Sequence, residues 1–196
     1  YSSSPFTEFS ELIGDTLFFA DDDQVSGKEL WAHKPSNGST WQVADISPGG
    51  AGSEDPGHRL SHVVDDVLYF SASDGSYISI WAHNPSNGST WRASNEVQPS
   101  CQSSSSNECG SVVVDDVIYF QGIENNSAYG HAAYAISKTG KLFFLDGADV
   151  GGGGSLNQAT WVARNNETVS SILEPGLHAH LSLSPLEDQF AVTIYE

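Results

Sequence analysis

Residues 30–42 read LWAHKPSNGSTWQ, and the pattern returns at residues 80–92 as IWAHNPSNGSTWR, with ten of thirteen positions identical. A second motif keeps the same spacing, because VVDDVLYF at 63–70 returns as VVDDVIYF at 113–120. Two motifs that share a period of fifty residues identify a repeat protein, and periods of this length are typical of β-propellers and related arrays. The repeats therefore indicate architecture more strongly than chemistry.

Each repeat is predicted to contain two β-hairpins. In the first hairpin, apolar runs flank a two-residue turn at Gly14-Asp15, Asp65-Asp66 or Asp115-Asp116, which suits tight turns with positive φ. In the second hairpin, Pro-Ser-Asn-Gly turns the chain between strands that carry tryptophan. The third copy has drifted, and Tyr134 is predicted to take the place of Trp31.

The fold is predicted to be all-β, because no ten-residue stretch shows helical periodicity without Gly or Pro. Four pairs of hairpins give about four four-stranded antiparallel units, which favours a small four-bladed β-propeller or a propeller-like array. A single β-repeat domain is expected over 1–196, with a glycine-rich connector at 147–159. The expected copies, the last of them degraded, span about 9–57, 58–100, 110–147 and 160–196.

The chain is strongly acidic, with 25 Asp and Glu residues against 7 Lys and Arg and a formal net charge of −18. Such a surface repels the phosphates of nucleic acids and of anionic lipids. No apolar run is long enough to cross a bilayer. Nucleic acid and membrane insertion are therefore not expected, whereas divalent or other cationic partners, high salt, or a simply soluble secreted protein suit this charge.

Several features favour an exported protein. Cys101 and Cys109 bracket a short polar loop, and a disulfide across it is expected outside the cytosol. Four Asn-x-Ser/Thr sequons are candidates for N-glycosylation, unless they arose by chance in a chain rich in Ser and Asn: Asn37, Asn87, Asn125 and Asn166. Because the chain contains no Met, we interpret it as a mature chain after removal of a leader, extracellular or at the cell surface.

Residues 10–121 closely resemble the ELWxxDGT repeat of secreted and surface proteins of bacteria and archaea, and the remainder resembles it weakly. The resemblance is carried by Glu29-Leu30-Trp31, by the strand Gly14–Phe19 and by the exit Asp45–Gly50. The sequence departs from the family where Asp-Gly-Thr would follow the tryptophan, because the longer turn Lys34–Thr40 stands there. The resemblance implies a propeller-like β repeat outside the cell, and it transfers no catalytic residues.

Candidate binding residues fall into three groups. Asp21, Asp22 and Asp23 offer the oxygen ligands that Ca²⁺ prefers, although a solvated acidic loop explains them as well. His178 and His180 stand two apart in a predicted strand, which suits either a metal site or a solvated strand face. No cofactor is otherwise required. The tryptophans are candidates for sugar stacking or for the core, and they are Trp31, Trp41, Trp81, Trp91 and Trp161.

Three classes of function remain. The first is an extracellular structural or adhesive repeat protein that binds copies of itself, as the subunit of a surface fibre or matrix, with terminal strands pairing between subunits. The second is a lectin-like propeller that binds glycans. The third is a glycoside hydrolase on a propeller scaffold. The chain lacks a Gly-x-Ser-x-Gly elbow, an HExxH helix and a free thiol beside histidine, so we predict that it is not an enzyme.

Overall fold

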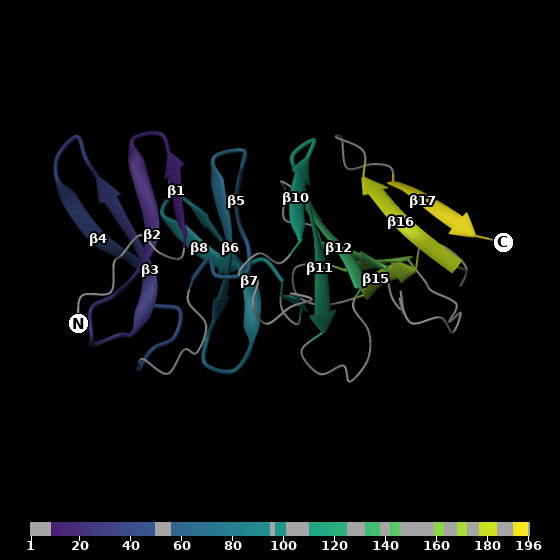
Figure 1. Ribbon diagram of the computed structural model, residues 1–196, viewed down its shortest axis with the longest axis horizontal. Coiled ribbons are helices and arrows are strands. Elements are labelled where there is room, and N and C mark those ends of the chain that lie inside the picture. The colour runs from purple at the N-terminus through teal and green to yellow at the C-terminus, as the bar shows by residue number, and fades with distance from the viewer. Residues whose placement is uncertain are drawn as a thin grey trace. The chain divides into compact units, whose positions relative to one another are not determined.

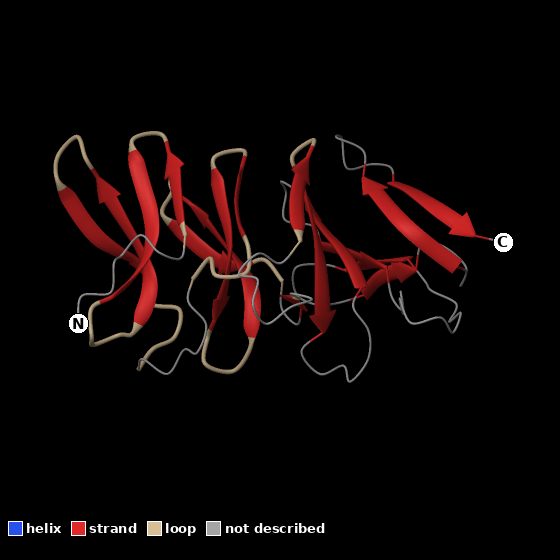
Figure 2. Ribbon diagram, viewed as in Figure 1, coloured by secondary structure: helices blue, strands red, loops and turns tan. Residues whose placement is uncertain are grey.

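The computed structural model consists of β-strands joined by turns and loops, and it confirms the all-β prediction (Figures 1 and 2). It describes residues 9–49, 56–94, 97–100, 110–124, 132–137, 142–145, 159–162, 168–171, 177–183 and 190–195, and beyond Ser137 it describes the backbone of the strands. None of these segments is a helix long and apolar enough to span a membrane.

The chain divides into two compact units, Tyr1–Arg92 and Ala93–Glu196. The first unit holds two antiparallel sheets of four strands, each in chain order. The first sheet consists of β1 (Ser10–Ile13), β2 (Thr16–Asp22), β3 (Lys28–Lys34) and β4 (Ser39–Ala44). The second sheet consists of β5 (Ser61–Val64), β6 (Val67–Ser73), β7 (Ile78–Asn84) and β8 (Ser89–Arg92). Each of these repeats therefore forms the two consecutive hairpins that the sequence predicts.

The strands of the second unit are β9 (Val97–Pro99), β10 (Ser111–Val114), β11 (Val117–Glu124), β12 (Ala132–Ser137), β13 (Leu142–Leu145), β14 (Ala159–Val162), β15 (Thr168–Ser171), β16 (Leu177–Leu183) and β17 (Phe190–Tyr195). Strands β10 to β15 form the third sheet in chain order, β9 adds to β11 as its seventh strand, and β16 pairs with β17 separately.

The second unit differs from the expected four strands per copy. Strand β13 pairs with β14, so that Leu142 lies opposite Val162 and Leu145 lies opposite Ala159. The third copy therefore shares one sheet with β14 and β15, which begin the predicted fourth copy. This pairing satisfies backbone N–H and C=O groups that two open strand edges would otherwise present.

The acidic turns adopt the backbone predicted for them. The φ angles are 52° and 59° at Asp65-Asp66, and 50° and 62° at Asp115-Asp116. Positive φ at both central residues is characteristic of type I′ turns, whose twist matches that of the flanking strands. The second hairpins turn on Gly38 and Gly88, both at φ 71°. Turn chemistry therefore fixes the register of these hairpins.

Tyr134 takes the place of Trp31 in the third copy, as predicted. Trp31 lies opposite Phe19 across β2 and β3, and Tyr134 lies opposite Phe120 across β11 and β12. The rings of Phe120 and Tyr134 stack with centroids 5.4 Å apart and planes inclined by 19°. A Cβ added at Gly122 would lie 2.7 Å from the Tyr134 ring, so only glycine fits there. The aromatic pair is therefore kept although the sequence has drifted.

Strand pairing gives each sheet two faces, because paired residues share a face and successive residues alternate. Face A is the face that carries Phe18, Tyr69 and Tyr119 in the first, second and third sheets. Face B is the opposite face, and it carries Leu17, Leu68 and Ile118.

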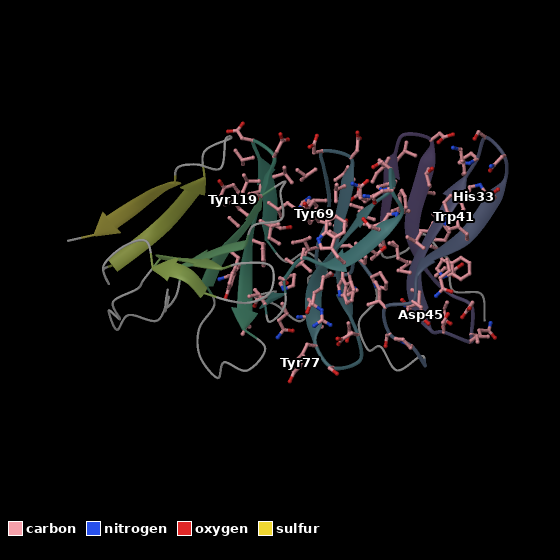
Figure 3. All side chains as sticks on the ribbon, turned by 180° about the vertical axis from the view of Figure 1, so that it is seen from behind. His33, Trp41, Asp45, Tyr69, Tyr77 and Tyr119 are labelled. Atoms are coloured by element: carbon pink, nitrogen blue, oxygen red, sulfur yellow. The ribbon has the colours of Figure 1, made fainter. Side chains whose placement is uncertain are left out.

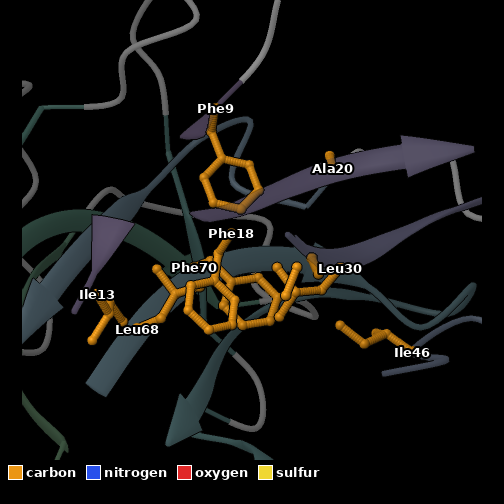
Figure 4. Close-up of a cluster of buried hydrophobic side chains, with 10 residues drawn as sticks. Phe9, Ile13, Phe18, Ala20, Leu30, Ile46, Leu68 and Phe70 are labelled. Atoms are coloured by element: carbon orange, nitrogen blue, oxygen red, sulfur yellow. The ribbon is translucent and has the colours of Figure 1, made fainter. Parts of the chain in front are cut away.

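Face A of the first sheet packs on face B of the second sheet (Figure 4). The shared core comprises Phe9, Ile13, Phe18, Ala20, Leu30, Ala32, Ile46, Leu68, Phe70 and Ala72. The Phe18 ring lies 5.4 Å from the His83 ring of the second sheet. At the edge, the Ser61 hydroxyl donates a hydrogen bond to the Glu11 carboxylate at 2.9 Å. The two repeats are thus stacked face to face on one hydrophobic core.

Candidate functional site

The acidic triplet Asp21–Asp23 closes the turn between β2 and β3. Asp23 Oδ1 accepts hydrogen bonds from the backbone N–H groups of Ser26 (2.7 Å) and Val25 (2.8 Å). These donors hold the pKa of the Asp23 carboxyl below its usual value. Asp21 and Asp22 each accept one backbone N–H as well. The carboxylates therefore cap the turn. No group of three or more His, Cys, Asp or Glu residues that could hold a metal ion occurs in the described part of the chain.

Asp74 forms the corresponding turn in the second sheet. Its Oδ1 accepts hydrogen bonds from the N–H groups of Ser76 (2.9 Å) and Tyr77 (3.0 Å). Asp74 also forms an ion pair with Arg92, whose guanidinium lies 5.2 Å from the centre of the Trp81 ring. Partial burial opposes ionisation, but these N–H donors and Arg92 outweigh it and lower the pKa of Asp74. The carboxylate again supports the turn.

Glu29 is a buried carboxylate whose role the sequence did not reveal. Its side chain is 1% exposed, Oε2 accepts the N–H of Ile46 at 2.7 Å, and Oε1 accepts the N–H of Ser47 at 2.9 Å. Burial raises the pKa of Glu29 despite these two donors. Both oxygens are occupied, so Glu29 anchors the chain that leaves β4. Ser79 holds the equivalent position in the second repeat.

The tryptophans differ in exposure. Trp41 is 40% exposed on β4 (Figure 3), whereas Trp31, Trp81 and Trp91 are partly buried. The indole N–H groups of Trp31 and Trp81 are enclosed without a hydrogen-bond partner among the described residues. Trp41 is therefore the described tryptophan best placed to stack on a sugar. The side chain of Trp161 lies outside the described residues.

His33 and His83 occupy equivalent positions and make equivalent contacts. Their Nδ1 atoms lie 2.8 Å from Thr40 Oγ1 and 2.9 Å from Thr90 Oγ1. His83 is only 5% exposed, because the first sheet covers it, and burial lowers the pKa of His83. His33 makes the equivalent contact with Thr40, but its side chain is partly exposed. Both residues contribute to strand packing rather than to a described metal site.

We expect the stability of the protein to depend on His83 as the pH falls below about 6.5. A lowered folded pKa means that the unfolded chain binds the proton more readily, so stability is full above the ordinary value of 6.5 and falls as the pH drops toward the folded pKa. The H83Q variant should therefore show a shallower loss of unfolding free energy in this window. Urea titrations at several pH values measure it.

The matched control is H33Q, because His33 makes the same threonine contact from a more exposed position. It removes the same threonine contact without removing the buried imidazole of His83. If H83Q keeps the full slope, the pH dependence arises from other groups, among them His62, whose pKa burial also lowers.

Cys101 and Cys109 lie outside the described residues, but the residues that flank them do not. The Ser100 N–H donates to the Gln121 carbonyl at 2.9 Å, and the Gln121 N–H donates to the Gly110 carbonyl at 3.4 Å. Ser100, before Cys101, and Gly110, after Cys109, are therefore both hydrogen-bonded to Gln121 on β11. The disulfide between the two cysteines stays a prediction.

We predict that thiol titration of the denatured, unreduced chain finds no free cysteine. Opening the predicted disulfide with a reductant, or replacing both cysteines by serine, should lower the unfolding free energy by about 2–3 kcal/mol, as expected for a loop of about nine residues. Two titratable thiols in the native preparation would contradict the pairing.

Two other groups of candidates are described only in part. Asn37 and Asn87 are exposed at the hairpin tips, where their Oδ1 atoms accept the N–H groups of Ser39 and Ser89. Asn125 and Asn166 lie outside the described residues. His178 and His180 stand on β16 with a register shift between them, and their side chains are also outside the described residues.

Seven large hydrophobic side chains are exposed in the described part of the chain. The described ones are Leu12, Val25, Trp41, Tyr77, Val112, Val113 and Val114. Four of these seven lie on only two strands, β1 and β10, and both strands are the edges of their sheets. The sequence shows one sign of this pattern, because SVVV in the third copy replaces SHVV in the second. We treat Leu12 on β1 and the three valines on β10, called the β1 strip and the β10 strip below, as the candidate site, since exposed apolar clusters mark interaction surfaces.

Comparison with known proteins places the chain in no family. No family model matches the sequence, and no curated protein matches it. Among solved structures, TolB from Acinetobacter baumannii is similar with a TM-score of 0.37 and 12% sequence identity, over 83% of this chain and 41% of that one. The chain therefore spans about two fifths of the length of that protein.

Proposed function

We propose that this protein is an extracellular structural repeat protein of the β-propeller-like type that associates with copies of itself through its outermost hairpins. The observation that carries the proposal is the exposure of three consecutive valines on the edge strand β10, together with that of Leu12 on the edge strand β1. Edge strands of soluble monomers are usually protected by charge, proline or a covering segment. Val112, Val113 and Val114 are instead 53%, 36% and 48% exposed on consecutive positions of β10.

The polar residues of the first unit support a structural role. Glu29, Asp23 and Asp74 use their carboxylate oxygens to hold turns and strand exits. A glycoside hydrolase needs two carboxylates that face a sugar across a cleft. Carboxylates engaged in turn capping favour the structural interpretation over the hydrolytic one.

An extracellular location rests on the predicted disulfide and on the sequons. Asn37 and Asn87 stand at exposed tips of equivalent turns, where a glycan would project away from the sheets. The repeat of one sequon at one structural position supports glycosylation at that position in both copies. Mass spectrometry of the protein purified from its natural source tests this proposal.

Self-association is tested by sedimentation of the full chain at increasing protein concentration. The net charge of −18 opposes contact between copies, and salt screens that repulsion. We therefore expect the assembled fraction to rise between about 0.15 M and about 1 M sodium chloride. A protein that stays monomeric under all of these conditions would contradict the proposed self-association.

A lectin-like function is the second candidate, and Trp41 favours it. The indole is 40% exposed on β4. Exposed aromatic faces are the usual platform for sugars. Glycan-array binding that is lost in W41A and kept in Y77A would establish this function, since Tyr77 has a similar exposure of 44% between β6 and β7.

A further inference from the structure

We infer that copies of this chain stack head to tail, with face A of the β10 hairpin of one copy packed on face B of the β1 hairpin of the next. This inference rests on the proposed self-association and assigns its surfaces. The occupant of each strip is thus a second copy of the same chain. The contact would repeat, between two copies, the interface that joins the first two repeats inside one molecule.

In that internal interface, β1 lies beside β5. Ile13 projects from face A of the first sheet into the shared core, and Val63 from face B of the second sheet packs against the same core. Ile13 is the last residue before its turn, and Val63 is the second-last before the next turn. One repeat therefore binds the next through face A of its first hairpin and face B of the following one.

The same face A position is uncovered in the third sheet. Ile13 and Val64, the residues before the first two turns, are 9% and 3% exposed, whereas Val114 before the third turn is 48% exposed. Val112, two residues earlier on the same face, is 53% exposed. Face A of β10 thus presents exposed apolar side chains at the positions that form the stacking interface between the first two repeats.

The complementary surface is Leu12 on β1 of the first sheet, which is exposed. Leu12 occupies on β1 the position that Val63 occupies on β5, and both lie on face B. Val63 is partly buried against the first repeat. Leu12, in contrast, is 64% exposed. A Val114 to Leu12 contact between copies would repeat the internal arrangement in which Ile13 and Val63 pack on one core.

Such an assembly joins two different surfaces, so it is heterologous and each copy keeps one free surface of each kind. Growth then continues into a filament, or stops if the rotation closes a ring. In contrast, edge-to-edge pairing of β10 with β10 would join identical surfaces and stop at a dimer. The two modes of assembly can therefore be distinguished with variants in which only one of the two strips is disrupted.

The test uses the full chain with L12D or V114D, each of which places a charge in one strip and leaves the other intact. Both residues are exposed, so both variants should unfold within about 3 °C of the original protein. Alone, each variant should associate at least about tenfold more weakly than the original, because burying an unpaired carboxylate is costly. Mixed together, they should form a one-to-one dimer and no larger species, since one intact strip of each kind remains.

The matched control is V25D, because Val25 is 83% exposed on the turn after β2 and lies on neither strip. It should associate as the original chain does. If the original chain stays monomeric, the proposed function fails and the inference with it. If the original assembles and L12D or V114D assembles equally well, or if the blocked variants do not pair with each other, the head-to-tail inference is wrong and self-association stands.

Discussion

Replacing Glu29 by alanine is expected to lower the unfolding free energy by about 2–4 kcal/mol, because two buried backbone N–H groups lose their acceptor. The carboxylate is 1% exposed and holds the N–H groups of Ile46 and Ser47. Chemical denaturation followed by tryptophan fluorescence measures the effect. The matched control is S79A, at the equivalent position of the second repeat, where the hydroxyl is fully buried and has no hydrogen-bond partner among the described residues. S79A should change stability little.

The cost of E29A should also depend on pH. Burial raises the pKa of Glu29 above its ordinary value of 4.5. The folded state therefore binds the proton more readily than the unfolded state, so the stabilising contribution is full below about pH 4.5 and declines as the pH rises through the folded pKa. The difference between the original protein and E29A should be larger near pH 4.5 than near pH 8. A difference that grows with pH would show that the ionised carboxylate is the form favoured by folding.

The F70A variant is expected to lose about 3–5 kcal/mol, since truncation of a buried phenylalanine removes apolar contacts and leaves a cavity. Phe70 is 0% exposed on face B of the second sheet, in the core shared with Phe18 and Leu30 of the first sheet. Denaturant titration measures the loss. V25A is the control, because Val25 is 83% exposed and its truncation should cost little.

The same variant tests whether the two repeats fold as one stack. Hydrogen exchange of F70A should lose protection in β2 and β3 of the first sheet as well as in β6 and β7 of the second. Loss confined to the second sheet would mean that the repeats are stable independently, contrary to a shared core.

Much of the first unit could be predicted from the sequence, because its signals are local. The Asp-Asp and Asn-Gly dipeptides determine the turns, and a two-residue turn leaves one register for the strands on either side. The fifty-residue period then carries the same hairpins from one copy to the next. Tyr134 could be placed opposite Phe120 on the same basis, although its surroundings have drifted.

The remaining features depend on contacts between residues that are distant in sequence. The pairing of β13 with β14 spans the glycine-rich connector, and no local pattern indicates which strand completes an open edge. Glu29 stands in a recognisable motif, but its bonds to Ile46 and Ser47 depend on how the chain returns after β4. The exposure of Leu12 and Val114 likewise depends on which repeat covers which face, since the corresponding residues Val63 and Ile13 are covered where the first two repeats stack.

Sedimentation velocity of the full, unmodified chain over a wide range of concentration, at low and at high salt, tests self-association most directly. Self-association predicts species heavier than the 20.9 kDa chain, with an average mass that increases with protein concentration and with ionic strength. A single species of 20.9 kDa at every concentration and salt level would contradict it.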